Sequence, residues 1–158
     1  RFDLVMGYSR QMSHMHTSYL PHNFSTLIVP KRWPEEEYHG LQPSAHISFF
    51  ASNCNSEFRQ NWVAGLMESI EVDAFGVCHH NKDLPPKLLA RQQEGDADVR
   101  YEQGAKTWRP SMAGQSEVKV MVMAKYKFGL AIENIPEPDY ITEKLFEVIE
   151  AGGGPIYF

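Results

Sequence analysis

YKFGLAIENIPEPDYITEKLFEVIEAGGGPIYF, residues 126–158, is the stretch that decides the fold. Its short apolar run, Gly129–Ile132, suits a buried strand that ends at Glu133, and a loop with two prolines follows. Apolar residues then recur at helical spacing from Ile141 to Ile149, three glycines stop the helix, and Pro155–Phe158 begins another strand. The predicted unit is strand, loop, helix and strand, which is typical of a parallel α/β sheet.

Several polar residues of this unit fall just beyond the end of its first strand, where parallel α/β sheets bind their ligands. They are Asn134, Tyr140, Glu143 and Lys144. A lysine in the first turn of a helix adds a full positive charge where the helix amides already favour an anion. A surface ion pair of Lys144 with Glu147 or Glu150 is an equally simple interpretation.

An upstream segment repeats this arrangement. His46–Ala51 predicts a buried strand, Ser56 an N-cap, and residues 57–70 a helix with apolar side chains at helical spacing. Arg59 falls in the first turn of that helix, which suits a phosphate contact. Surface pairing of Arg59 with a neighbouring glutamate, Glu57 or Glu68, is the competing interpretation.

Two further elements complete the α/β alternation: a strand at Val72–Phe75 and a short helix at Val118–Ala124. The 158 residues are 42% hydrophobic, enough for one domain with a core, and the net charge of −5 argues against nucleic-acid or polybasic membrane binding. No apolar run is long enough to cross a membrane, and the start shows no signal-peptide pattern. Because the chain begins without Met and stops inside a strand, we expect it to be part of a longer protein.

The first 43 residues are harder to interpret. Leu4–Met6 and Phe24–Val29 suit short strands, and the prolines from Pro30 to Pro43 suggest an exposed loop or linker. Three histidines also fall here, at positions 14, 16 and 22. No cysteine or carboxylate stands at ligand spacing beside them, so a solvated loop is the better interpretation than a metal site.

Residues 81–116 form a polar insertion rich in Lys, Gln, Glu, Asp and Gly. We expect a mobile surface excursion, with a short helix at Pro86–Gln93. The triplet Asp96-Ala97-Asp98 has the form with which some glycosyltransferases hold a metal ion. It lies in a polar loop and not after a hydrophobic strand, so we interpret it as solvated charge.

Three blocks of the sequence resemble the α1,3/4-fucosyltransferases, glycosyltransferase family 10. YKFGLAIEN followed by DYITEKLF and the glycine turn is similar to the donor-binding signature of that family, with Ile132 in place of the usual Phe. Ser48–Asn81 resembles a second family block, in the form seen in plant-like core α1,3-fucosyltransferases. Phe2–Pro21 is similar to a third, although His14 stands where the family has an acid.

The resemblance implies a Rossmann-like parallel sheet with flanking helices, part of the C-terminal half of a GT-B glycosyltransferase. Residues 1–43 would end the acceptor domain and linker, and residues 44–158 would form a GDP-fucose-binding domain truncated at its C-terminus. Arg59 and Lys144 would bind the phosphates, Asn134 and Tyr140 the nucleoside, and Glu143 would lie by the fucose and stabilise the transition state. Glu133 would orient the loop.

The implied reaction is inverting transfer of L-fucose from GDP-fucose to a GlcNAc hydroxyl of a glycan, an N-glycan by preference. No metal is obligatory, with a divalent cation at most stimulatory. The general base would come from an N-terminal domain that this chain lacks, so we expect the isolated chain to be inactive. Golgi localisation and a membrane anchor upstream are likewise implied. A transferase for another nucleotide sugar, or a non-catalytic remnant, remains an alternative.

Cys54 and Cys78 are the only cysteines, and each follows a predicted strand at its carboxyl end. Neighbouring parallel strands would bring them close together, and a secretory location would allow a disulfide. The sequence alone does not exclude two free thiols. Related plant-like sequences carry cysteines at both places, and this resemblance favours a bridge.

Overall fold

A four-stranded parallel sheet is the centre of the molecule, with strand order β4-β3-β5-β6. The structure is a computed structural model that describes residues 6–7, 15–16, 30–97 and 112–158. The strands are β3 (Ile47–Phe49), β4 (Val72–Ala74), β5 (Phe128–Ala131) and β6 (Gly154–Tyr157). Ile47 pairs with Val72 on one side and with Phe128 on the other, so β3 is central. The predicted fold class is confirmed.

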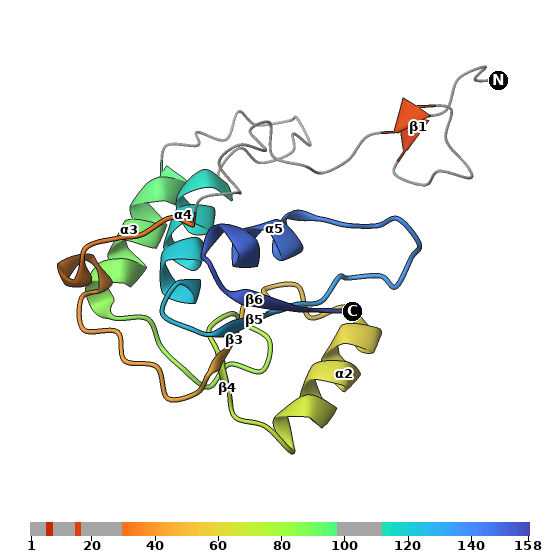
Figure 1. Cartoon of the computed structure of the whole chain (residues 1–158), viewed down its shortest axis with the longest axis horizontal. Helices are drawn as coiled ribbons and strands as arrows, with labels where there is room; N and C mark the ends of the chain where they lie inside the picture. Colours follow the sequence, from red (N-terminus) through yellow and green to blue (C-terminus); the bar gives the residue numbers. More distant parts are fainter. Residues whose placement is uncertain (1–5, 8–14, 17–29, 98–111) are drawn as a thin grey trace.

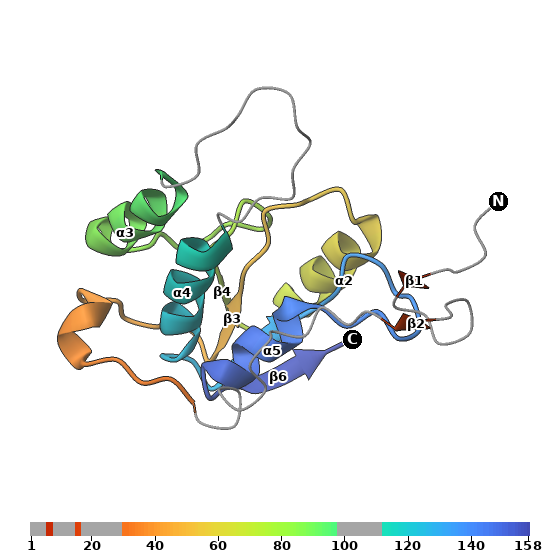
Figure 2. The same ribbon diagram turned by 90° about the horizontal axis from the view of Figure 1, so that it is seen from above.

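Helices cover both faces of this sheet (Figure 1). α2 (Glu57–Met67) follows β3 and lies on one face, whereas α4 (Met112–Met123) and α5 (Glu143–Glu150) lie on the other. α3 (Pro86–Ala97) packs on the outer side of α4, as the view from above shows (Figure 2). The order of β3, α2, β4, α3, α4, β5, α5 and β6 is the alternation that the sequence predicted.

The apolar core consists of a layer on each face of the sheet. On one face, Val63 of α2 is fully buried in a cluster that includes Phe49 of β3. On the other, Val120 of α4 and Val148 of α5 pack with Ala131 of β5. All three residues of β3 are buried, as a central strand requires, whereas β6 alternates between half-buried and exposed positions at the edge of the sheet.

Two glycines allow close approaches that no other residue would permit. A Cβ atom at Gly76, just after β4, would lie 2.1 Å from the carbonyl oxygen of Ala51, just after β3. A Cβ atom at Gly129 in β5 would lie 2.6 Å from the Val148 side chain of α5. The first contact brings together the loops that leave β3 and β4, and the second seats α5 directly on the sheet.

The insertion 81–116 differs from the sequence expectation in its described part. α3 extends to Ala97 instead of ending at Gln93, and α4 begins at Met112 and not at Val118. Leu88 of α3 is fully buried in a cluster with α4 residues, so this helix is part of the core and not a surface excursion. A helix that packs against one neighbour needs few apolar residues, which explains why the polar composition was misleading.

The proline-containing segment before β3 is also more ordered than expected. Glu35–Tyr38 form a 3-10 helix, η1, whose Tyr38 is buried in the same cluster as Leu88, as is Leu41. Nearer the N-terminus, β1 (Met6–Gly7) pairs in parallel with β2 (Met15–His16). The strand expected at 24–29, most of the strand expected at 4–6, and positions 14 and 22 lie outside the described residues.

Candidate functional site

A cavity of about 750 Å³ opens at the carboxyl edge of the sheet, bordered by the loops after β3, β4 and β5 and by the first turn of α5. Four of the five residues predicted to bind a donor line it: Arg59, Asn134, Glu143 and Lys144. They come from two segments separated by more than seventy residues of sequence, and the parallel register of β3 and β5 brings them together.

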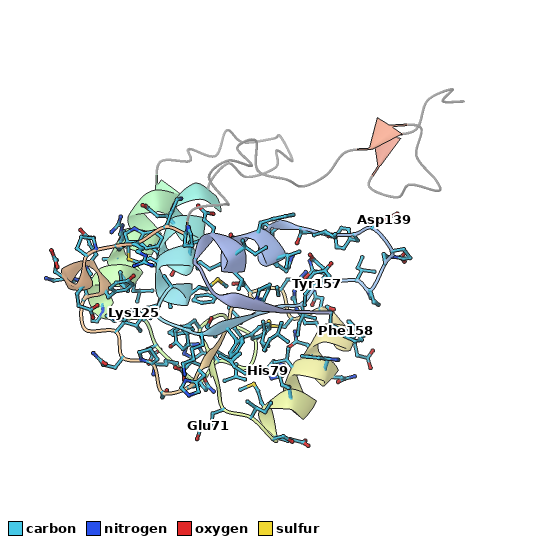
Figure 3. The ribbon with its side chains drawn as sticks, viewed as in Figure 1. Glu71, His79, Lys125, Asp139, Tyr157 and Phe158 are labelled. Carbon is cyan, nitrogen blue, oxygen red and sulfur yellow. A yellow bond between two sulfur atoms is a disulfide. The ribbon has the colours of Figure 1, made fainter. Side chains whose placement is uncertain are left out.

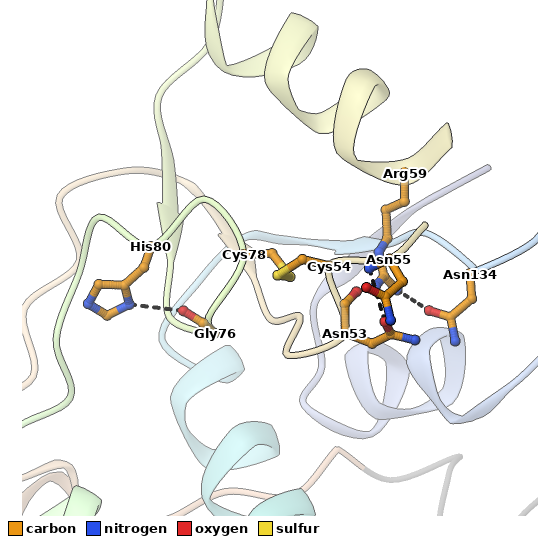
Figure 4. Close-up of a disulfide and its surroundings, with 8 residues drawn as sticks. All are labelled: Asn53, Cys54, Asn55, Arg59, Gly76, Cys78, His80 and Asn134. Atoms are coloured by element: carbon orange, nitrogen blue, oxygen red, sulfur yellow. Dashed lines mark hydrogen bonds between the residues drawn. A yellow bond between two sulfur atoms is a disulfide. The ribbon is translucent and has the colours of Figure 1, made fainter. Parts of the chain in front are cut away.

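Arg59 is a deeply buried charged residue of this site, with 2% of its surface exposed. Ser56 caps α2 as predicted, because its hydroxyl accepts a hydrogen bond from the Arg59 backbone N–H at 3.3 Å. The guanidinium donates from Nη1 to Asn134 Oδ1 and from Nη2 to the carbonyl oxygen of Asn53 (Figure 4). Surface pairing of Arg59 with a glutamate of its own helix is therefore wrong.

The Arg59 guanidinium is only partly satisfied by the described residues. Burial lowers the pKa of Arg59, and the negative charge of Glu133 opposes this shift. An arginine nevertheless remains charged at neutral pH. Its buried Nε has no hydrogen-bond partner among the described residues. Leaving a buried donor unpaired costs about 1–3 kcal/mol, so an anion that accepted from this side chain would recover part of that cost.

Lys144 lies in the first turn of α5, and its ammonium forms ion pairs with two carboxylates. Its Nζ lies 2.7 Å from Thr142 Oγ1, 3.1 Å from Glu133 Oε2 and 3.1 Å from Glu143 Oε1. Burial alone would lower the pKa of Lys144, but the charges of Glu143 and Glu133 raise it above its usual value, and the ammonium stays charged. The alternative of a surface pair is wrong, since Lys144 faces the cavity instead.

Glu133 connects the end of β5 to the start of α5. Its buried carboxylate accepts a hydrogen bond from the Thr142 backbone N–H at 2.7 Å, and both of its oxygens accept from the Thr142 hydroxyl. Thr142 is the N-cap residue of α5, so these bonds set where the helix begins and where Lys144 points. This geometry agrees with the expectation that Glu133 orients the loop.

Glu143 contributes a partly exposed carboxylate to the cavity wall. Burial alone would raise the pKa of Glu143, but Lys144 and a weaker contribution from Lys119 lower it overall. The group is therefore ionised at neutral pH. A carboxylate beside two cations can stabilise a positive charge that develops on a sugar ring, without itself taking up a proton.

Tyr140 is the predicted donor-binding residue that the structure does not place at the cavity. It lies half-buried in the loop before α5, and its carbonyl oxygen accepts a hydrogen bond from the Tyr157 hydroxyl at 3.2 Å. Figure 3 shows the neighbouring Asp139 at the far end of this loop. The sequence placed Tyr140 near the expected site but gave no information on the path of the loop.

Lys119 is a cavity residue that the sequence analysis missed. It comes from α4, where Val118 and Val120 on either side are buried, and its ammonium pairs with the carboxylate of Glu147 on α5. A lone cation in the apolar run 118–124 was the available signal. The packing of α4 against α5, which brings it to the cavity, was not readable from spacing.

A disulfide joins Cys54 and Cys78, with their Cα atoms 5.5 Å apart, and links the loops after β3 and β4 (Figure 4). The bridge favoured by the family resemblance is thus present. Constraining a loop of this size stabilises a fold by about 3 kcal/mol. The bond also anchors the loop of Asn53, whose carbonyl oxygen holds Arg59.

The described residues contain no group of three or more His, Cys, Asp or Glu side chains that could hold a metal ion. Asp96 and Ala97 belong to the end of α3, and Asp98 lies outside the described residues. Within the described part of the chain, no helix has the length and apolar character needed to span a membrane.

Comparison with known proteins identifies the family. The model for "Glycosyltransferase family 10 (fucosyltransferase) C-term" matches residues 42–158. GDP-fucose protein O-fucosyltransferase 3 of Danio rerio is 35% identical over 76% of this chain and 22% of its own length. Alpha-(1,3)-fucosyltransferase B of Drosophila melanogaster is 33% identical over 76% of this chain and 23% of its own length. The chain spans less than a quarter of these curated relatives.

A solved structure shares the fold. The crystal structure of an α1,3-fucosyltransferase with GDP superposes with a TM-score of 0.60 at 17% identity, covering 99% of this chain and 47% of that one. The matched half of that enzyme thus has the same α/β architecture. Together with the family match over most of the chain, this places the protein in glycosyltransferase family 10, the fucosyltransferases.

Proposed function

We propose that this chain forms the donor-binding half of a fucosyltransferase that takes L-fucose from GDP-fucose. The observation that carries the proposal is the convergence of Arg59 and Lys144, each from the first turn of a helix, on one cavity at the carboxyl edge of the sheet. Fixed cations and helix amides at this place suit a diphosphate. Membership of the fucosyltransferase family supports GDP-fucose as the molecule that contains this diphosphate.

Each residue of the site has a role in this proposal. Arg59 and Lys144 bind the two phosphates, and Asn134 and Tyr140 contact the nucleoside. Tyr140 does not line the cavity, so its contact with the nucleoside requires the loop before α5 to move towards the donor. Glu143 lies beside the fucose, where its carboxylate stabilises positive charge on the ring.

The proposed reaction is an inverting displacement without an obligatory metal ion. As the bond to fucose breaks, negative charge grows on the departing diphosphate, and Arg59 and Lys144 neutralise it in place of a metal. A divalent cation would at most stimulate the reaction. The acceptor hydroxyl must lose a proton to a general base, which we assign to a part of the protein outside these residues. We therefore expect this chain alone to bind donor weakly and not to turn over.

The acceptor has two candidates. The first is a GlcNAc hydroxyl of an N-glycan, which the similarity of Ser48–Asn81 to plant-like core fucosyltransferases favours. The second is a hydroxyl of a protein side chain, because relatives from Danio rerio and Bos taurus carry the name GDP-fucose protein O-fucosyltransferase 3. Both reactions use the same donor and the same cavity.

We place the protein in the Golgi lumen, held to the membrane by an anchor outside this chain. The Cys54–Cys78 disulfide supports an oxidising compartment, since such bonds are rare in the cytosol. Retention of the bond after purification under non-reducing conditions, measured by thiol titration, would agree with this location. Two titratable thiols in freshly isolated native protein would contradict it.

The test of the donor proposal is calorimetry with GDP-fucose, with GDP-mannose and UDP-galactose as controls. We expect selective guanine-nucleotide binding that Lys144→Ala weakens by about 1.5–3 kcal/mol, the value of a hydrogen bond to a charged group. Equal binding of UDP-galactose would point to another nucleotide sugar. Absence of binding to a demonstrably folded chain would contradict the donor role.

A further inference from the structure

Lys119 places a third cation in the wall of the cavity. The residue lies on α4, an element that contributes neither Arg59 nor Lys144, and its side chain is 19% exposed. Its neighbours along the helix are buried, so α4 cannot rotate to carry the ammonium away from the cavity without exposing apolar surface. The position of this charge is therefore fixed by the core.

The balance of charge in the cavity depends on Lys119. The described cavity wall carries the carboxylates of Glu143 and Glu147 and three cations, Arg59, Lys119 and Lys144, and Glu133 forms an ion pair with Lys144. Without Lys119, three carboxylates would face two permanent cations, and the site would carry an excess of negative charge. A nucleoside diphosphate brings at least two negative charges, and such a site would repel it.

Glu147 positions the Lys119 ammonium and leaves some of its N–H donors for a ligand in the cavity. Glu147 is buried on α5, one turn beyond Glu143, and accepts a hydrogen bond from Lys119 Nζ. Since an ammonium has three N–H donors, this bond leaves donors that an oxyanion in the cavity can use. The charge of Lys119 also acts on Glu143 across the site, which it helps to keep ionised.

We propose that Lys119 is a third cationic contact to the diphosphate of the donor, and that Glu147 is the residue that positions it. The proposal rests on the donor function proposed above and extends it to α4, a helix that contributes neither Arg59 nor Lys144. α4 then has a part in binding as well as in packing, and the phosphates are held from three sides of the cavity.

The test compares binding of GDP and guanosine to the 158-residue chain and to Lys119→Gln, by calorimetry or ligand-observed NMR. We expect Lys119→Gln to weaken GDP binding about tenfold, or about 1.4 kcal/mol, and to leave guanosine binding within about twofold. Lys119→Arg should restore most of the GDP affinity, because it keeps the charge. The matched control is Lys125→Gln, since Lys125 pairs with the exposed Glu35 and lies on the opposite side of the molecule from Asp139 (Figure 3).

The outcomes separate this inference from the donor function. Unchanged GDP affinity in Lys119→Gln, with the wild-type chain binding GDP, overturns the role of Lys119 alone. An equal loss for GDP and guanosine also overturns it, because the effect would then be structural. Failure of the folded wild-type chain to bind GDP refutes the donor function and this proposal with it.

A double-mutant cycle tests the positioning role of Glu147. We expect Glu147→Gln to weaken GDP binding by a few-fold in the wild-type background and to have no further effect in Lys119→Gln, because its influence passes through Lys119. Equal losses in both backgrounds would mean that Glu147 acts independently of Lys119, and the positioning role would be wrong.

Discussion

Replacing Glu133 by Gln removes the buried charge that joins the end of β5 to the start of α5. The Glu133 side chain is 3% exposed, its oxygens accept three hydrogen bonds from Thr142, and it forms an ion pair with the partly buried Lys144. Gln keeps the volume and one acceptor oxygen but presents two N–H donors where the Thr142 groups also donate. Lys144 keeps Glu143 as its partner.

The expected loss of stability follows from these contacts. Breaking a buried ion pair by removing one partner costs about 3–5 kcal/mol. Because Lys144 retains Glu143 and Gln retains one acceptor, we expect the free energy of unfolding to fall by about 2–3 kcal/mol. At about 2–4 °C per kcal/mol for a chain of this size, the melting temperature should drop by about 5–10 °C.

Urea unfolding followed by circular dichroism measures this difference. The matched control is Glu35→Gln, which removes the same charge from a carboxylate that is 75% exposed and pairs with Lys125. Such a surface pair contributes less than about 1 kcal/mol, so this variant should unfold close to wild type. The reasoning is refuted if Glu133→Gln is no less stable than Glu35→Gln.

Three further predictions concern the loops that leave the sheet and the carboxylate beside them. Gly76→Ala should lower the melting temperature by several degrees, because its Cβ would meet the Ala51 carbonyl oxygen. The control Gly65→Ala, in the open middle of α2, should be neutral or stabilise the protein by up to about 1 kcal/mol. Equal effects of the two substitutions in melting experiments would contradict this. Replacing both Cys54 and Cys78 by Ser should cost about 3 kcal/mol in urea unfolding and weaken GDP binding, and unchanged binding would show that the bond does not support the site. Burial alone would raise the pKa of Asp73, but hydrogen bonds from Ser44, Tyr126 and Lys82 lower it below the ordinary 3.8. The contribution of Asp73 to stability is therefore present above pH 4 and lost as the pH falls through the folded pKa. Asp73→Asn should flatten that part of the profile of unfolding free energy against pH.

Most of the fold could be predicted from the sequence, because most strands and helices have a recognisable local pattern of residues. Apolar runs bounded by glycine and proline marked β3 and β5, and Ser56 marked the start of α2. The polar helix α3 was underestimated, since its contribution to the core comes mainly from Leu88 and its composition resembles that of a loop. Local patterns reveal how an element starts and ends but not how much of it another helix will cover.

The site was predictable where its residues lie at fixed points of a strand–helix junction. Arg59 and Lys144 each occupy the first turn of a helix that follows a strand, and the parallel sheet then forces them to the same edge. Lys119 depends on how two helices cross, and Tyr140 depends on the path of a loop. Neither of these is encoded in the spacing of residues along the chain, so both required the three-dimensional structure.

The disulfide closes a loop that begins after β3 and contains α2 and β4, and this has a consequence for the order in which the protein folds. Its two cysteines are 24 residues apart, and both precede β5 in the sequence, so they leave the ribosome before any residue of β5 does. The bond can therefore lock the Arg59 half of the site while the Lys144 half is still in the ribosome. Expression hosts that oxidise thiols only after release of the finished chain would lose this order, and we expect lower yields of folded protein from them.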